Sequence, residues 1–381
     1  MFFCKNCLQP SHRPRIQFSR RGWCNACEWH EQKMTTVDWK AQYGELGSLC
    51  DRFRRKDGWW DALVPCSGGK DGSYVSWKLK HDFGMNVLGV SCPPLIPTRI
   101  GEENLRNYKY SGFQHMSMPI DLEALRIASK KGFVDQGRPW HAFDTMISTS
   151  IIQFALRLDI PLIVYGEEGE REYGGATDAR QKIDRKYLLD YYYCGHDPSQ
   201  YGLMWKLPKQ KDLDKLYLTH WSKFEDWDPQ VHARSAKEHC GLEMLVGGSI
   251  GTFTNYASLD DLTRDLHVFL QFTKFGFGRC IQDANVEVRR GRMSRAQAVE
   301  VSKKIDGVFP MEVLPSYLDY YEMKETEFWE VIDRWVDYDI LYKTGKPEKP
   351  YELKDEYSNY NVFMPDDCDG VNFERGKFSS V

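Results

Sequence analysis

A glycine-rich turn between an apolar run and a helical pattern is the feature that most constrains the fold of this chain. Ala62-Leu63-Val64 leads into Ser67-Gly68-Gly69-Lys70-Asp71-Gly72-Ser73, and a helical pattern then continues through His81. Glycines let the backbone turn sharply and present its amides to an anion, and the N-terminus of the next helix adds partial positive charge. The G-x-x-x-x-G-K-[ST] spacing of the Walker A loop is absent. The turn therefore predicts a phosphate-binding loop of another kind.

Apolar segments and helical patterns continue to alternate after this turn. The further segments expected to form strands are residues 86–91, 113–119 and 162–166, with a possible fifth strand at 216–218. Helical spacing covers residues 102–110 and 143–158. Strands separated by helices indicate a parallel sheet with helices on both faces. The expected fold class is therefore α/β.

Four of the eleven cysteines lie at the start of the chain, as Cys4-x2-Cys7 and Cys24-x2-Cys27. Two CxxC pairs separated by a loop of this length are typical of four-cysteine zinc sites. The residues between them hold little aliphatic material, and structural zinc supplies on the order of 10–16 kcal/mol toward folding such a module. Because all four positions would be filled, the predicted zinc is structural. A pair of redox-active or incidental CxxC sequences is the alternative.

The charge balance and hydropathy exclude several classes of protein. Lys and Arg number 51 against 55 Asp and Glu, which is unlike the basic surface of a nucleic-acid binder. No uninterrupted apolar stretch approaches the ~18 residues of a membrane span. The first ten residues lack the basic and apolar regions of a signal peptide. We therefore expect a cytoplasmic protein that binds neither nucleic acid nor membrane.

An acidic segment follows the fourth predicted strand, at residues 165–175. Ligands of open α/β sheets bind at the carboxyl ends of the strands. Glu167 is therefore a candidate to hold Mg²⁺ or to contact substrate, and Glu172 is a second candidate for substrate. A solvated acidic loop is the alternative.

Two further segments are candidates for substrate contacts, residues 251–260 and residues 274–279. The second places Lys274 and Arg279 around two glycines, a pattern suited to a phosphate or carboxylate. Ordinary helix capping by cations is the alternative. A helix is expected to start at 258–261, and Ser294 and Gln297 form a predicted capping box.

Composition divides the chain into four predicted parts. They are a four-cysteine module at residues 1–33, an ATP-pyrophosphatase domain at 34–257, a helical substrate-binding region at 258–345 and a loosely ordered polar tail at 346–381.

These motifs resemble one family over nearly the whole chain, the N-acetyl sugar amidotransferases, which include WbpG-type and PseA-type enzymes. The turn at 67–73 resembles the SGG-x-D-S signature of the PP-loop ATP pyrophosphatases, although Cys66 and Gly72 depart from the usual run. The other matching segments are the cysteine pairs, GEE…EYGG at 166–175, GTFTNYASLDD at 251–261, KFGFGR at 274–279 with Asp283, and DGVFP at 306–310.

The resemblance implies an ATP-dependent enzyme that converts an acetamido group of a nucleotide-linked sugar into an acetamidino group, in lipopolysaccharide O-antigen or flagellin-glycan biosynthesis. ATP, Mg²⁺ and Zn²⁺ are the implied cofactors. The implied ATP-binding residues are Ser67, Gly68, Gly69, Lys70, Asp71, Gly72, Ser73 and Gly166, with Lys70, Asp71 and Glu167 catalytic. The implied substrate contacts are Glu172, Thr254, Asn255, Tyr256, Lys274, Arg279 and Asp283, and the implied zinc ligands are Cys4, Cys7, Cys24 and Cys27.

The source of ammonia is expected to be a separate protein. Residue 2 is Phe, so an N-terminal cysteine nucleophile is absent, and none of the cysteines stands in a nucleophile-elbow pattern. The resemblance implies separate glutaminase and cyclase-like subunits similar to those of the histidine pathway.

Two other interpretations remain open. A tRNA-thiolating PP-loop enzyme also combines such a loop with zinc-binding cysteines, and Cys66 or Cys92 would then carry sulfur. Such an enzyme needs a basic face for RNA. The other interpretation is a zinc-ribbon binding module fused to a non-catalytic nucleotide fold, against which the intact Lys70, Asp71 and Ser73 argue.

Overall fold

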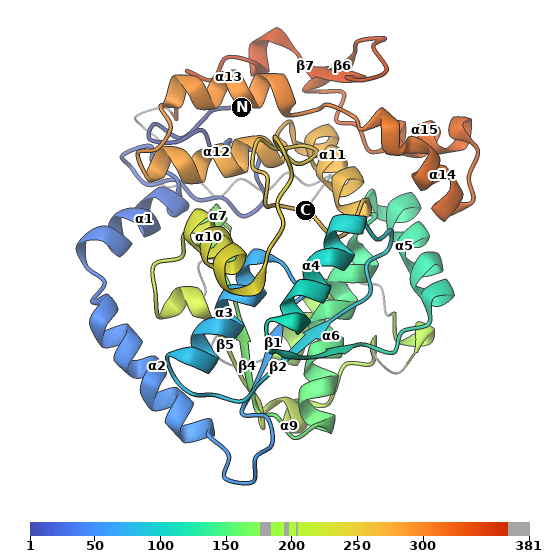
Figure 1. The fold of residues 1–381 in the computed structure, drawn as a ribbon. Helices are drawn as coiled ribbons and strands as arrows, with labels where there is room; N and C mark the ends of the chain where they lie inside the picture. The colour runs from blue at the N-terminus through green and yellow to red at the C-terminus, as the bar shows by residue number, and fades with distance from the viewer. Residues whose placement is uncertain (176–183, 194–197, 203–204, 365–381) are drawn as a thin grey trace.

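The computed structural model describes residues 1–175, 184–193, 198–202 and 205–364. Its centre is a five-stranded sheet in the order β3-β2-β1-β4-β5, and every neighbouring pair is parallel (Figure 1). The strands are β1 Ala62–Pro65, β2 Val87–Ser91, β3 Gln114–Ser117, β4 Leu162–Tyr165 and β5 Tyr217–His220. The expected α/β class with a parallel sheet is confirmed, and the fifth predicted strand is present.

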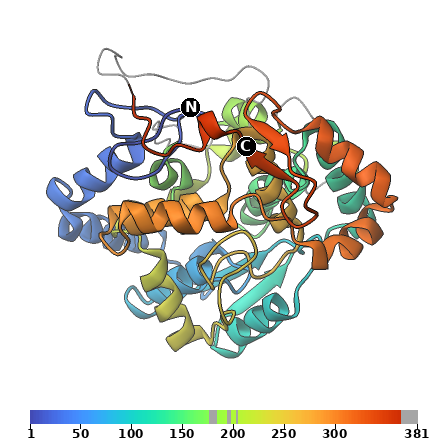
Figure 2. The ribbon, with the colours of Figure 1, turned by 90° about the horizontal axis from the view of Figure 1, so that it is seen from above.

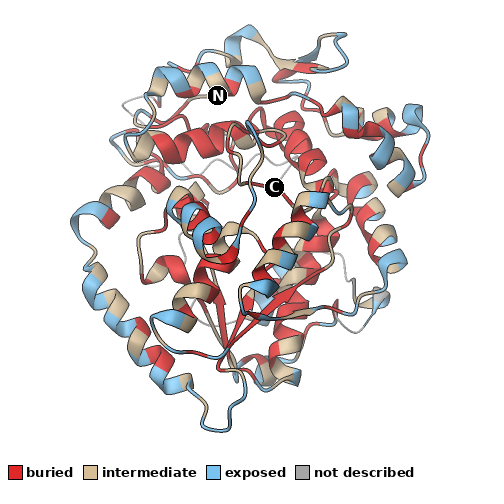
Figure 3. Cartoon of the chain, viewed as in Figure 1, coloured by how far each residue is buried: buried red, intermediate tan, exposed pale blue. Residues whose placement is uncertain are grey.

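Successive residues of the central strands face opposite helical layers, as the pleat of a strand requires. Val64 and Val164 pack into one apolar core, whereas Leu63 and Ile163 pack into another on the opposite face. All four are completely buried, and Figure 3 shows the strands as the most buried part of this region. The first face is covered by α2 Trp39–Phe53, α3 Lys70–His81, α4 Arg99–Tyr110 and α10 Pro229–Cys240, and the second by α5 Leu122–Gln136 and α6 His141–Arg157.

The C-terminal region is helical and lies beyond one end of the sheet (Figures 1 and 2). It consists of α11 Thr263–Phe275, α12 Arg279–Arg289, α13 Arg295–Ile305, α14 Leu314–Tyr321, α15 Glu325–Arg334 and a hairpin of β6 Leu341–Lys343 and β7 Tyr351–Leu353. An aromatic-rich core joins α11, α14, α15 and the hairpin to Phe133 of α5. The Ser294–Gln297 capping box of α13 is present as expected.

Two expectations about this region differ from the structure. The helix expected from 258–261 begins at Thr263, because the carboxylate of Asp261 accepts hydrogen bonds from the backbone amides of Leu95 and Thr263 instead of continuing a helix. The expected loose tail is packed as far as residue 364: Tyr351 and Tyr360 are buried, and Tyr360 stacks on Phe3. Burial of these aromatic side chains therefore orders the segment, although most of its residues are polar. Residues 365–381 lie outside the described residues.

The N-terminal module ends in α1 Asn25–Thr35. This helix lies beside α7 Gly169–Tyr173, which follows β4. The amide of Phe3 donates to the carbonyl of Val362, and the amide of Leu8 donates to Asn285 of α12. The module is thus packed against the C-terminal region, and its predicted boundary at residue 33 remains a prediction.

The remaining short helical segments of the described residues are α8 Arg185–Leu188, a π-helix Leu189–Tyr193, α9 Gln210–Leu213 and 3-10 turns at Pro198–Tyr201, Trp221–Lys223, Met311–Val313 and Asp355–Tyr357.

Among the described residues, no helix combines the length and apolarity that crossing a bilayer requires.

Candidate active site

The glycine-rich loop joins β1 to the first turn of α3, and Gly69 is the residue before the helix. Gly68 has a φ of +87°, and a Cβ there would lie 2.5 Å from the backbone nitrogen of Leu105. A Cβ on Gly72 would lie 2.7 Å from the carbonyl oxygen of Pro65. The loop is therefore pressed against α4 and against the end of β1, which explains why residue 72 carries no side chain.

Asp71 lies at the start of α3 and is held by three neighbours. Its Oδ1 accepts a hydrogen bond from Trp227 Nε1 at 3.0 Å and lies 2.7 Å from His232 Nδ1. Its Oδ2 pairs with the ammonium of Lys70. Burial raises the pKa of the Asp71 carboxyl, but the charge of Lys70 and the bond to His232 outweigh burial, so that its net pKa lies below the ordinary value. Asp71 is therefore a carboxylate of fixed orientation.

The end of β4 brings Gly166 and Glu167 to the same place. A Cβ on Gly166 would lie 2.6 Å from the Cβ of Asp71, so the two loops are in direct contact. Burial and the negative charge of Asp71 raise the pKa of Glu167 to about 7, and the charge of Lys70 only partly offsets them. Burial lowers the pKa of Lys70, but the charges of Asp71 and Glu167 more than compensate, and its net pKa is raised. Lys70, Asp71 and Glu167 thus form one cluster, as the sequence predicts. Two carboxylates beside a glycine-rich loop of this kind are a ligand set suited to Mg²⁺.

The C-terminal region contributes Arg279, the first residue of α12, to this cluster. Arg279 Nε lies 2.8 Å from Asp283 Oδ1, and the guanidinium lies 5.6 Å from the ring centre of Tyr173. Its charge acts on the pKa values of both Lys70 and Glu167. A cation from residues 274–279 therefore reaches the glycine-rich loop.

Asp283 connects Arg279 to the segment expected to contact substrate. Its Oδ2 accepts hydrogen bonds from Thr252 Oγ1 at 2.7 Å and Thr254 Oγ1 at 3.3 Å. Burial and the charge of Asp283 raise the pKa of Tyr256, and Lys70 is close enough to act on it as well. Thr254, Tyr256 and Asp283 are thus brought to the cluster.

Lys274 belongs to a different cluster. It is 2% exposed, and among the described residues it forms neither an ion pair nor a hydrogen bond. Burial lowers its pKa to about 7, and the charge of Arg138 adds to the effect. Its charge also acts on the buried His267. Arg264 also acts on the pKa of His267, and Arg279 acts in turn on the pKa of Arg264, so the groups around Lys274 border those around Arg279.

The structure turns three other predicted residues away from the cluster. Both carboxylate oxygens of Glu172 contact the N-terminal module, through Trp29 Nε1 and Lys33 Nζ. Asn255 donates to the carbonyl of Leu245. Ser73 is fully buried beneath the loop, whereas Ser67 is only partly buried.

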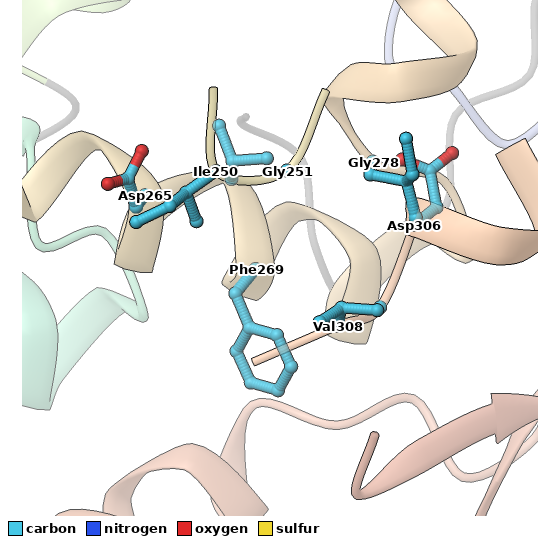
Figure 4. A pocket seen from close by; sticks show the side chains of 10 residues that line it. Ile250, Gly251, Asp265, Phe269, Gly278, Asp306 and Val308 are labelled. Atoms are coloured by element: carbon cyan, nitrogen blue, oxygen red, sulfur yellow. The ribbon is translucent and has the colours of Figure 1, made fainter. Parts of the chain in front are cut away.

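A small cavity beside α11 is not a substrate site (Figure 4). It is lined by Gly251, Phe269, Gly278 and Asp306, and its volume is about 10 Å³, close to the minimum for one water molecule. Asp306 accepts hydrogen bonds from the amides of Cys280 and Ile281 and so caps the N-terminus of α12. An external anion therefore has no access to that helix end.

The four N-terminal cysteines form one buried cluster. The Cys4–Cys27 and Cys7–Cys24 sulfur pairs are 3.7 Å apart, Cys24 and Cys27 are 3.6 Å apart, and all four sulfurs lie within 4.8 Å of one another. In a tetrahedral site with Zn–S bonds of about 2.3 Å, the sulfurs are about 3.8 Å apart. The cluster therefore fits zinc with all four ligand positions supplied by the chain.

Sequence reasoning missed Trp227, His232 and Tyr173. The Asp228-Pro229 pair could have indicated Trp227 and His232, because it marks the start of a helix. Asp228 caps α10 and thereby places His232 in its first turn, facing α3. Tyr173 is part of the EYGG motif, but only its position beside Arg279 reveals its relevance.

Comparison with known proteins bears on the C-terminal part of the chain. Residues 250–356 match the family described as LPS biosynthesis protein WbpG-like, C-terminal domain, which confirms the predicted resemblance to WbpG-like proteins. No curated protein matches the sequence. One solved structure, titled a predicted subunit of tRNA methyltransferase from Methanocaldococcus jannaschii, is 14% identical, covers 55% of this chain and 86% of that chain, and has a TM-score of 0.29.

Proposed function

Because residues 250–356 match the model of the WbpG-like C-terminal domain, we propose that the protein is an ATP-dependent amidotransferase acting on a nucleotide-linked N-acetyl sugar. It converts an acetamido group into an acetamidino group. The observation that carries the proposal is the meeting of Lys70 and Glu167, from the parallel-sheet domain, with Arg279, from the WbpG-like region. A phosphate-binding loop and a second, cationic contact surface thereby line one site.

The first step activates an unreactive carbonyl. The acetamido oxygen attacks the α-phosphorus of ATP, the new O–P bond forms, and the bond from the α-phosphorus to the bridging oxygen breaks to release pyrophosphate. The loop amides and Lys70 stabilise the negative charge of the departing pyrophosphate, a role worth roughly 3–4 kcal/mol for each well-placed donor. Asp71 would hold the Mg²⁺ that accompanies ATP.

The second step replaces oxygen by nitrogen. Ammonia attacks the carbon of the O-adenylated amide, which is protonated on nitrogen, and the C–N bond forms. The resulting ammonium adduct loses one proton, and the neutral tetrahedral species then breaks its C–O bond, so that AMP leaves and the amidinium cation remains. Glu167 is suited to accept a proton here, because a catalytic base works best when its pKa lies near the operating pH.

Arg279 and Asp283 are proposed to orient the acceptor sugar, with Thr254 and Tyr256 beside them. Lys274 is proposed to meet a separate anionic group of the same acceptor, because it lies in another cluster. Ammonia is proposed to come from separate glutaminase and cyclase-like subunits, and a cytoplasmic location is proposed because ATP and nucleotide sugars occur there.

The experiment is to incubate the purified protein with ATP, Mg²⁺, a UDP-linked acetamido sugar and ammonium chloride, without RNA. We expect release of AMP and pyrophosphate that depends on the sugar, and a product whose mass corresponds to NH in place of O. Parallel reactions with glutamine in place of ammonium should be inactive until a glutaminase is added. AMP formation that requires tRNA and ignores the sugar would favour the thiolating enzyme instead.

A further inference from the structure

The chemistry proposed above does not explain the N-terminal cysteine module, yet this module contacts the segment that carries Glu167. We define the β4 loop as residues 166–175. The side-chain amide of Asn25 donates to the carbonyl of Gly175 at 2.6 Å, and Arg13 Nε donates to the carbonyl of Gly174 at 3.3 Å. The module therefore binds the backbone of the β4 loop through Asn25, which follows Cys24, and through Arg13, from the segment between the two cysteine pairs.

A buried ion pair reinforces this contact. Lys33 Nζ lies 2.8 Å from Glu172 Oε2, and their side chains are only 2% and 6% exposed. Trp29 Nε1 donates to the other oxygen of Glu172 at 2.9 Å. A buried charge that loses its partner is strongly destabilised, so this pair holds its two segments together. Glu172 lies one residue before Tyr173, which faces Arg279.

Lys33 also reaches the segment that holds Asp71. Its ammonium lies 3.0 Å from Asp226 Oδ1, which also pairs with Arg290 of α12 at 2.9 Å. The next residue along the chain, Trp227, donates to Asp71. One lysine of α1 therefore contacts both of the segments that position the carboxylates of the site.

We propose that the N-terminal cysteine module positions the active site, with Lys33 as the positioning residue that fixes the β4 loop and the Asp226–Trp227 segment. The module thereby determines where Glu167 lies relative to the phosphate-binding loop and how the Asp71 carboxylate of that loop is oriented. The catalytic part of this inference rests on the proposed function, whereas the mechanical part does not depend on any reaction.

The test compares Lys33→Met with wild type in the full chain by backbone hydrogen exchange. We expect amides of residues 167–175 to exchange at least about tenfold faster in K33M, because local opening of the loop no longer breaks a buried ion pair. Amides of β1 and β2 should keep their protection. The matched control is Arg21→Ala, which removes a cation of the same module whose ion pairs, within the described part of the chain, are with Glu28 and Glu31 of α1. Unchanged exchange at 167–175 in K33M would overturn the proposal.

A second variant covers the case in which K33M fails to fold. Asn25→Ala removes the 2.6 Å bond to Gly175 without leaving a buried charge, and faster exchange of the same loop is again expected. Lys33→Arg keeps the cation and should restore much of the protection.

Activity measurements connect the mechanical result to the site. In acceptor-dependent AMP formation, K33M should lower kcat more than it raises the KM for ATP, because the glycines and backbone amides of the phosphate-binding loop are untouched, and R21A should match wild type. Loss of loop protection in K33M with unchanged kcat would reject the positioning role. Loss of protection in a protein whose wild type shows no such reaction would support the mechanical inference and reject the proposed function alone.

Discussion

His232 Nδ1 lies 2.7 Å from Asp71 Oδ1, where the first turn of α10 packs on the first turn of α3. The imidazole is 1% exposed and stacks on Tyr74 with ring centres 3.9 Å apart. The His232 ring cannot rotate away without disrupting the packing between α3 and α10. The orientation of the Asp71 carboxylate is therefore set by the packing of two helices.

Replacing His232 by Leu should shift the acid unfolding of the protein to higher pH. His232 helps to depress the pKa of Asp71. A carboxylate with a depressed pKa stabilises the fold above its ordinary pKa of about 3.9, and this contribution is lost as the pH falls through the folded-state value. Without His232 that loss begins at higher pH. The midpoint of acid unfolding, followed by circular dichroism, checks this, with His232→Gln, which retains a donor, as the control. Identical midpoints in H232L and wild type would contradict the role.

Replacing Glu167 by Gln should abolish most activity and yet stabilise the protein at alkaline pH. Loss of a catalytic base typically lowers kcat by about 10²–10⁴-fold. The pKa of Glu167 is raised to about 7, above the ordinary value of about 4.3, so the folded state binds the extra proton and stability falls as the pH rises between these values. The Tm of E167Q, measured without metal or ATP, should exceed that of wild type at pH 8 and match it near pH 4.

The control for this variant is Glu168→Gln, because the carboxylate of Glu168 lies beside Arg171 at 3.5 Å instead. A loss of activity in E168Q as large as that in E167Q would contradict the assignment of Glu167 as the catalytic base.

Lys274→Met should raise stability while weakening acceptor binding. The pKa of Lys274 is lowered by burial to about 7, from an ordinary value of about 10.4. Between these values the unfolded state binds the extra proton, so wild-type stability rises with pH. The gain in Tm for K274M should therefore be larger at pH 6 than at pH 10. The KM for the acceptor should rise while ATP binding is retained; an unchanged KM would contradict a substrate role.

Cys24→Ser should remove the metal and destabilise the module. Structural zinc supplies on the order of 10–16 kcal/mol in zinc-finger peptides, so loss of one ligand should lower the Tm severely. Metal analysis should find one zinc per chain in wild type and a substoichiometric amount in C24S. Cys50→Ala, a buried thiol of α2 far from the cluster in sequence, is the control and should retain full zinc.

The three central strands, β1, β2 and β4, were predictable because they are short apolar runs separated by helical patterns. Leu162 to Tyr165 is buried on both faces, and a run of that kind leaves few alternatives. Lys70, Asp71 and Glu167 were predictable for a related reason, since both loops follow neighbouring parallel strands, which end at one edge of the sheet.

Trp227, His232 and the orientation of Glu172 were not predictable, because each depends on tertiary packing that joins distant parts of the chain. His232 contacts Asp71 across 161 positions, and Glu172 contacts Lys33 across 139 positions. An acidic loop carries no local signal of which carboxylate faces the ligand and which faces another part of the protein. The start of α11 was misplaced because Asp261 bonds to Leu95, again across the fold.

The packing of Leu8 against Asn285, 277 positions later, has a consequence for biosynthesis. Chains emerge from the ribosome amino end first, at about 5–20 residues per second. The cysteines are thus translated well before the helix that covers them. Throughout this interval, metal bound at the four-cysteine cluster would keep the thiols from misoxidation, so zinc depletion should act on the nascent chain more than on the finished protein.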